Sequence, residues 1–169
     1  MATDSISEQA TGLFADYSRD EERPLAGYAT LVGVFNALFA ACLVAAGRSG
    51  RMPERIGLGD LLLFGAATEK LSRVLAKDKV TSFLRAPFTR YQETGGPGEV
   101  EEEPRGHGLR LAVGELAVCP YCLAQWVAAG FLTGSVLAPR QTRLVAGVFA
   151  TIAISDFLQL AYRASEERA

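Results

Sequence analysis

The chain has 169 residues, 49% of them hydrophobic, with a formal net charge of −2 and a mean hydropathy of +0.16. This length suits a single domain, and the near-neutral charge excludes a basic nucleic-acid-binding protein. Three cysteines are too few for a secreted disulfide scaffold. Residues 1–24 form a polar, acidic N-terminal tail without the basic and short apolar parts of a signal peptide, so we expect no cleaved leader.

Three long apolar segments indicate an integral membrane protein. The first, Leu25–Ala46, carries no charge and, at 1.5 Å per residue, is long enough to cross a hydrocarbon core of about 30 Å. The others lie near residues 112–138 and near residues 144–162. Because buried helices of soluble proteins rarely stay apolar for so long, we expect each segment to be a transmembrane helix.

A shorter segment, residues 57–76, is predicted to be a further span. By itself it would also fit an amphipathic helix on the membrane surface, because it contains the charged residues Asp60, Glu69, Lys70 and Arg73. A fourth span places both chain ends on the same side as a long loop, residues 77–110. The sequence therefore predicts an all-α, polytopic bundle of about four transmembrane helices in one membrane domain, residues 25–163, followed by a short tail, residues 164–169.

Positively charged residues gather on one side of this predicted bundle. Arg73 and the loop at residues 77–110 carry seven of them, whereas the connections at residues 48–55 and 140–143 carry fewer. Lys and Arg are enriched on the cytoplasmic side of membrane proteins. We therefore expect a multi-pass protein of the bacterial cell membrane, with this loop and both termini in the cytoplasm.

The loop divides into a basic half and an acidic half. In the basic half, cations alternate with apolar side chains, as in a chain at the lipid headgroups; the cations are Lys77, Lys79, Arg85 and Arg90. An ordinary cytoplasmic loop gives the same pattern, so lipid binding is one of two interpretations. The acidic half, residues 92–108, is rich in Gly, Pro and Glu and is predicted to be mobile, with His107 exposed to solvent.

The sequence CPYC lies inside the third predicted span. Its two cysteines, Cys119 and Cys122, share helical spacing with Glu115 and Trp126, so the four fall within about 40° of one line. A carboxylate in a span turns toward the bundle interior, because placing it in lipid costs about 2.5–3.5 kcal/mol. The stripe should therefore face inward. Pro120 lacks a backbone N–H and is predicted to kink the helix.

Polar side chains of three predicted spans lie at one depth, about 10–13 Å from the cytoplasmic ends of their helices. In the second span, Glu69 and Arg73 have the spacing of a helical ion pair. The fourth carries Asp156 and Gln159 on one face. Together with Glu115, these residues are predicted to form an inner polar cluster around the two cysteines.

Three motifs give the chain a resemblance to a known family: ATEKLSRVLAKDKVTSFLRAPFTRY, GELAVCPYCLAQW and ISDFLQLAY. They resemble a family of bacterial integral membrane proteins catalogued as a domain of unknown function (thirteen-sixty), some members of which are linked to sporulation. The resemblance covers about residues 25–163 and implies a small multi-span membrane protein, without implying an activity. The residues that match the family pattern are Lys70, Leu71, Arg73, Asp78, Thr81, Arg85, Pro87, Glu115, Cys119, Pro120, Cys122, Trp126 and Asp156.

Two main interpretations follow for Cys119 and Cys122. In the first, they are small residues that pack helices, and the protein is a structural or interaction protein of the bacterial envelope rather than an enzyme. In the second, they are the catalytic pair of a membrane-embedded thiol oxidoreductase. Cys119 would then be the nucleophile, favoured as a thiolate by Arg73, and Cys122 the resolving thiol.

A third interpretation makes the thiols and the carboxylates of Glu115 and Asp156 a metal-binding site or an ion pathway. The ligands typical of structural zinc, histidines or a second cysteine pair, do not accompany them, so no metal ligand is assigned. We expect no cofactor and no nucleic-acid partner; the expected partner is the lipid bilayer, with anionic lipids or another membrane protein as candidates. Because their predicted depth faces a reducing cytoplasm, both thiols are expected to be reduced at rest.

Overall fold

The computed structural model describes residues 23–50 and 52–167; the rest of the two predicted tails, residues 1–22 and 168–169, lies outside the described residues. Most described residues are helical. In chain order the elements are α2 (Leu25–Arg48), α3 (Leu58–Lys77), the 3-10 helix η1 (Lys79–Thr81), α4 (Ser82–Arg85), β1 (Thr89–Thr94), β2 (Val100–Pro104), α5 (Gly108–Val118), α6 (Pro120–Leu137) and α7 (Pro139–Glu166).

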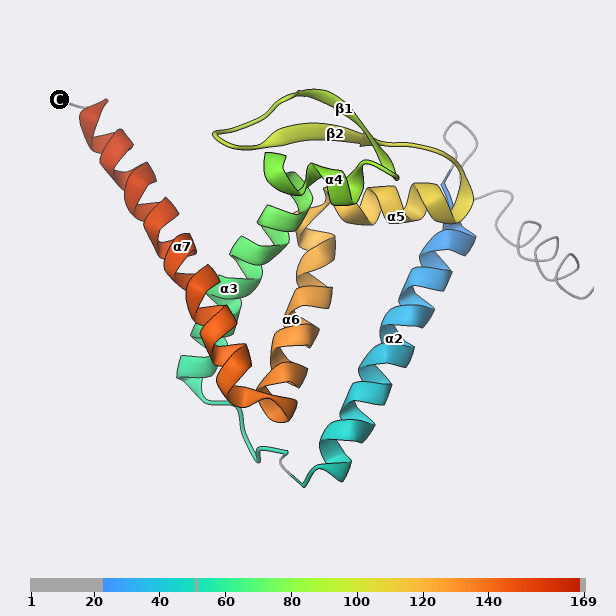
Figure 1. The fold of residues 1–169 in the computed structure, drawn as a ribbon, viewed down its shortest axis with the longest axis vertical. Coiled ribbons are helices and arrows are strands. Elements are labelled where there is room, and N and C mark those ends of the chain that lie inside the picture. The colour runs from blue at the N-terminus through green and yellow to red at the C-terminus, as the bar shows by residue number, and fades with distance from the viewer. Residues whose placement is uncertain (1–22, 51, 168–169) are drawn as a thin grey trace, which may run out of the picture.

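The long helices run side by side, and a smaller layer covers one end of them (Figure 1). α3, α6 and α7 pack against one another, while α2 stands at the edge and contacts α5 and α6. α5 lies across the end of the bundle, beneath α4 and the hairpin of β1 and β2. The N-terminal end of α2 and the C-terminal end of α7 both lie at this hairpin end of the molecule.

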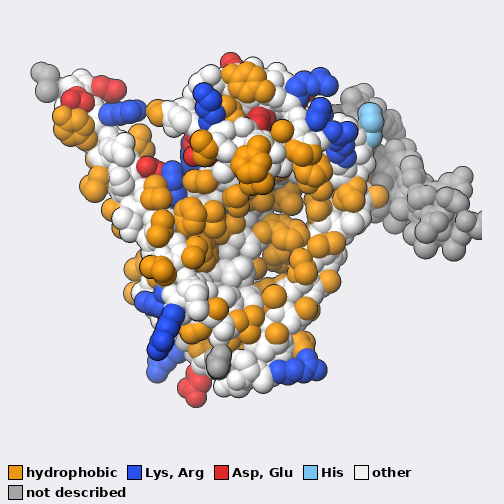
Figure 2. Space-filling model, viewed as in Figure 1, with side chains coloured by type: hydrophobic (Ala, Val, Ile, Leu, Met, Phe, Trp, Pro, Cys, Tyr) orange, Lys and Arg blue, Asp and Glu red, His pale blue; other side chains and the backbone are white. Residues whose placement is uncertain are grey.

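The hydrophobic core lies between α3, α6 and α7. Phe64 of α3 stacks on Phe131 of α6 with ring centroids 5.9 Å apart, and buried Ala67, Ala146 and Ala150 surround the pair. Such small residues let helices approach closely, as membrane helices do. Many large apolar side chains elsewhere stay exposed, and Figure 2 shows them covering the middle of the molecule, with charged side chains mainly toward the two ends.

Two helices, α2 and α7, are long and apolar enough to cross a membrane, and α5 with α6 would make a third span if the bent pair counts as one. α3 occupies the place of the predicted second span, residues 57–76, but does not reach this standard. The described residues are therefore compatible with a membrane protein, and four transmembrane helices stay a prediction.

The third predicted span, residues 112–138, is not one helix. α5 ends at Val118, α6 begins at Pro120, and the two are bent by 83°. The sequence predicted a kink, but the break is complete because Cys119 is extended, with φ −104° and ψ 103°. Proline disfavours a helical conformation of the preceding residue and is itself favoured at the first position of a helix. The Cys-Pro step therefore ends one helix and starts the next.

Glycines let α5 lie close to its neighbours on two sides. A Cβ atom on Gly27 of α2 would lie 2.7 Å from the Cβ of Ala112, and one on Gly114 of α5 would lie 2.7 Å from the carbonyl oxygen of Phe88. Real side chains do not tolerate such distances, so both positions depend on the missing side chain. α5 is thus held between α2 and the chain that leads into the hairpin.

The acidic half of the loop forms a β-hairpin, which corrects the prediction of a mobile loop at residues 92–108. β1 and β2 pair antiparallel, with a bulge between Tyr91 and Glu93. The order comes from long-range charge pairs that sequence periodicity does not reveal. Three cations from the preceding helices bind the glutamates of the hairpin at 2.5–2.6 Å: Arg73 with Glu99, Lys77 with Glu101, and Arg85 with Glu102.

Arg85 is the most buried of these cations, with 2% of its side chain exposed. Besides Glu102 it donates to the carbonyl oxygens of Leu75 and Asp78 and to the hydroxyl of Thr81, at 2.7–3.0 Å. The prediction that Arg85 faces lipid is therefore corrected. Its guanidinium group points into the protein, where its several N–H donors bind these acceptors. Of the other cations in the predicted lipid-facing segment, Lys77 is partly buried, while Lys79 and Arg90 are exposed, and their contact with lipid stays a prediction.

Replacing Arg85 by Leu should lower the free energy of unfolding by about 3–5 kcal/mol, because the side chain of Glu102, 5% exposed, would remain buried without its counter-ion. Thermal unfolding of the detergent-solubilised protein, followed by circular dichroism, measures the loss. The matched control is Arg90→Leu on the exposed part of β1, which should change stability by no more than about 0.5 kcal/mol. Similar losses in the two variants would contradict the assigned role of Arg85.

Candidate functional site

Cys119 and Cys122 lie where α5 turns into α6. The structure joins them as a disulfide between residues whose Cα atoms are 5.3 Å apart, within the usual range for such bonds. This arrangement shows that the two sulfur atoms can form a disulfide, and the expectation of two reduced thiols at rest in the cell stays a prediction. The bend brings the two sulfur atoms together over the first turn of α6.

Cys119 is the N-cap residue of α6. Its sulfur accepts a hydrogen bond from the backbone N–H of Cys122 at 3.2 Å, and its carbonyl oxygen accepts one from the N–H of Leu123 at 3.0 Å. The first N–H groups of a helix otherwise lack partners within the helix, and together they favour a negative charge. When the disulfide is reduced, this position favours the thiolate form of Cys119.

Sequence reasoning missed this helix N-terminus because it treated residues 112–138 as one span. The available signal was Pro120, since proline is common at the first position of a helix. The bend also changes the predicted stripe. Glu115 lies on α5, before the bend, whereas Cys122 and Trp126 lie on α6, so the four residues do not share one helix face.

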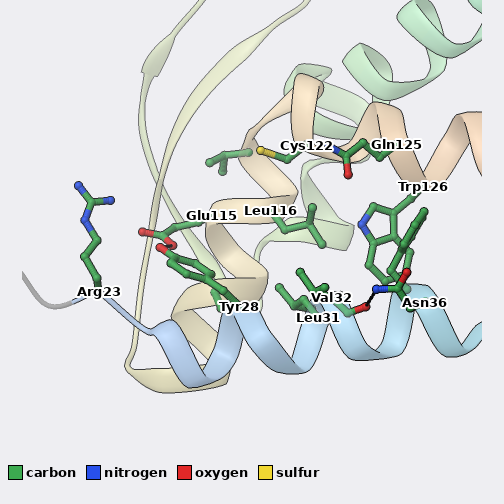
Figure 3. A pocket seen from close by; sticks show the side chains of 13 residues that line it. Arg23, Tyr28, Leu31, Val32, Asn36, Glu115, Leu116, Cys122, Gln125 and Trp126 are labelled. Atoms are coloured by element: carbon green, nitrogen blue, oxygen red, sulfur yellow. Dashed lines mark hydrogen bonds between the residues drawn. The ribbon is translucent and has the colours of Figure 1, made fainter. Parts of the chain in front are cut away.

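A cavity of about 790 Å³ lies between α2 and the bend of α5 and α6 (Figure 3). Cys122 lines it, and Trp126 stands one turn further along α6. The indole of Trp126 meets the ring of Phe35 on α2 edge to face, with centroids 5.1 Å apart. Most of the remaining wall is apolar and consists of Leu31, Val32, Ala112, Leu116 and Val118.

Polar groups occupy separate parts of this cavity. At one end, the hydroxyl of Tyr28 donates to the carboxylate of Glu115, which ties α2 to α5. Further along α2, the amide of Asn36 donates to the carbonyl oxygen of Val32 at 2.9 Å, and Gln125 lies on the α6 wall near Cys122. The structure thus places Glu115 in the same cavity as Cys122, but not among the other residues of the predicted inner polar cluster.

Those other residues line a separate cavity of about 380 Å³ between α3, α7 and the hairpin turn; they are Glu69, Arg73, Asp156 and Gln159. Their partners differ from the predicted pairing of Glu69 with Arg73. Asp156 pairs with Lys70 at 2.6 Å and Arg73 with Glu99 at 2.6 Å. Glu99 was missed because it belonged to a segment predicted to be mobile. A common function of this cluster stays a prediction.

Within residues 23–50 and 52–167, no group of three or more His, Cys, Asp or Glu side chains is placed to hold a metal ion. His107 is exposed and lies just before the N-terminal end of α5, whereas the cysteine pair follows the C-terminal end of that helix. Cys42, the third cysteine, is a free thiol on α2. The Cys119–Cys122 pair has redox chemistry of its own and lies beside a cavity whose lining is mostly apolar.

A family model described as protein of unknown function (DUF1360) matches residues 63–162. No curated protein and no solved structure matches the chain. The matched segment holds the hairpin, both cysteines of the CPYC sequence and the ion pair of Lys70 with Asp156. α2, which forms one wall of the larger cavity, precedes it in the chain.

Replacing Lys70 by Met should destabilise the protein by about 1–3 kcal/mol, between the losses typical of exposed and buried pairs. The side chain of Asp156, 44% exposed, would keep its charge beside α3 without its partner. The double variant Lys70→Met/Asp156→Leu removes both charges and should recover part of that loss, measured as melting temperature in detergent. Strictly additive losses would show that the pair contributes no coupling.

Proposed function

The chain belongs to the family of proteins of unknown function DUF1360, and for this member we propose a membrane-embedded thiol–disulfide exchange function carried by Cys119 and Cys122. The observation that carries the proposal is the disulfide-bonded pair at the N-terminus of α6, with the sulfur of Cys119 as the helix cap. A cysteine that serves only as a small packing residue needs neither a nearby thiol nor a helix N-terminus. Both features favour reversible redox chemistry.

In the proposed reaction, a dithiol on a partner protein is the electron donor. Its thiolate attacks the sulfur of Cys122, the more exposed of the two residues. The S–S bond breaks, and Cys119 leaves as a thiolate that the N-terminus of α6 favours. The second partner thiolate then attacks the mixed disulfide. The partner leaves as a disulfide, and two electrons and two protons remain on Cys119 and Cys122. This order exchanges the roles that the sequence suggested for the two residues.

The proposed location is the bacterial cell membrane, crossed several times, with the hairpin end and both chain ends in the cytoplasm. Membrane association is supported by α2 and α7, which are long and apolar enough to cross a bilayer. The orientation is supported by the cations in residues 73–110, which exceed those of the opposite connections. The cysteine pair would then lie toward the cytoplasmic end of the bundle, within reach of cytoplasmic dithiols.

A structural or interaction function is the second candidate. It is supported by α2, in which only Gly27 and Ala46 are buried, so that the apolar face turned away from α5 and α6 remains for lipid or a partner helix. The two candidates differ in what the sulfur atoms do. An interaction through α2 needs no exchange at Cys119 and Cys122, whereas the redox proposal requires it.

Alkylation of the oxidised, denatured protein should modify one cysteine, Cys42, and alkylation after reduction should modify three. With the oxidised, disulfide form of a dithiol protein as reactant, the Cys122 thiolate of the Cys119→Ser variant should attack that disulfide and accumulate a mixed disulfide, because the Cys119 thiolate that would displace the partner is gone. Mass spectrometry after acid quenching measures both results. The control variant Cys42→Ser should exchange normally. If alkylation still modifies three cysteines after the protein has been treated with a soluble disulfide, Cys119 and Cys122 do not form a disulfide and the proposal is refuted.

The protein should remain in the membrane fraction after carbonate extraction, because α2 and α7 expose apolar surface along most of their length. Reporter fusions at the N-terminus and at the C-terminus should both report a cytoplasmic location. A reporter active outside the cytoplasm at one end alone would mean an odd number of spans. Reporters active outside the cytoplasm at both ends would mean that the orientation is opposite to the proposed one. This result would not bear on the proposed chemistry of the two cysteines.

A further inference from the structure

We infer that the cavity between α2 and the bend of α5 and α6 binds a lipid-soluble quinone, which takes two electrons from the reduced Cys119–Cys122 pair. This inference rests on the proposed function and names its electron acceptor. The observation behind it is one juxtaposition: Cys122, half of the disulfide, lines a cavity whose other walls are mainly apolar and aromatic.

The size and the walls of the cavity suit a substituted quinone ring. Its volume of about 790 Å³ lies in the range of pockets that hold ligands of this size. Trp126 and Phe35 present aromatic rings from two different helices, against which a flat conjugated ring can pack. The charged side chains of the lining, Arg23 and Glu115, lie at one end of the cavity, while its middle is apolar and favours a molecule that dissolves in lipid.

Access from the bilayer follows from the position of α2. This helix forms one side of the cavity and is long and apolar enough to cross a membrane. Val32 lines the cavity yet is 60% exposed, so the cavity reaches the outer surface of the apolar helix. A ligand arriving through the hydrocarbon phase therefore meets the cavity without first crossing water.

The polar groups of the cavity match the two redox forms of a quinone. Carbonyl oxygens of the quinone accept hydrogen bonds, which the amide groups of Asn36 and Gln125 can donate. The hydroxyl groups of the quinol donate, and the carboxylate of Glu115, which already accepts from Tyr28, has further lone pairs. Figure 3 shows these groups around the apolar middle of the cavity, with Gln125 beside Cys122.

The transfer from the dithiol to the quinone balances in electrons and in protons. Two S–H bonds break at Cys119 and Cys122 and one S–S bond forms, which releases two electrons and two protons. The quinone takes up both electrons and both protons as two O–H bonds and leaves as a quinol. The restored disulfide can then accept electrons from the next partner dithiol, so quinone reduction completes the cycle of the proposed function.

Binding can be measured without the chemistry, because Trp126 is the only tryptophan of the chain. The full chain in detergent micelles, with Cys119→Ser/Cys122→Ser, is titrated with a short-chain quinone whose ring positions are all substituted, so that thiols cannot add to the ring. We expect saturable quenching of the Trp126 fluorescence. Quenching that rises linearly to the solubility limit, as for a free indole in the same micelles, would overturn the inference.

The reaction is measured by mixing the dithiol form of the native protein with the same quinone without oxygen. We expect one quinone reduced per protein and two thiols lost. Val32→Trp, which fills the cavity, should slow this reaction at least tenfold; Val34→Trp, at an exposed position of α2 outside the cavity lining, should not. Equal rates in the two variants would refute the site.

A protein that exchanges with soluble disulfides but not with the quinone would refute the quinone site alone. A protein that exchanges with neither would refute the proposed function itself.

Discussion

Pro120 cannot donate a backbone hydrogen bond to the preceding turn, and this single constraint organises one end of the molecule. With Cys119 extended before it, the helix cannot continue, so α5 turns by 83° and lies across the bundle. In that position α5 reaches α2 at Gly27 and the approach to the hairpin at Gly114. A continuous helix over residues 108–137 would leave α2 and the hairpin without this shared support.

The same break creates the two halves of the candidate site. It exposes a helix N-terminus directly at Cys119, where the sulfur replaces a missing backbone acceptor. It also moves α5 away from the line of α6, so that α2, α5 and α6 enclose a cavity beside Cys122. Redox-competent sulfur and an apolar cavity therefore share one cause.

The long helices could be predicted from the sequence because an apolar run is a local property of the chain. α2 and α3 begin and end within two residues of the predicted segments, and α7 contains its predicted segment, residues 144–162, with about a turn more at each end. Pro120 signalled a disturbance, but whether it bends or breaks the helix depends on contacts of α5 with segments far away in sequence. The hairpin was not predicted for a similar reason. Its local sequence is typical of a loop, and the ion pairs that hold it, Lys77 with Glu101 and Arg85 with Glu102, join residues far apart in the chain.

The charge pairs that fasten the hairpin differ in their contact with water. Arg73 keeps 51% of its side chain exposed, Lys77 20% and Arg85 2%. Dissolved salt screens exposed pairs, with a decay length of about 8 Å at 0.15 M, and acts far less on buried ones. Rising ionic strength should therefore weaken the pair of Arg73 with Glu99 at the hairpin turn more than the pair of Arg85 with Glu102. The charge pair best protected from salt, Arg85 with Glu102, thus lies on the strand that packs against α5, the helix that leads to Cys119.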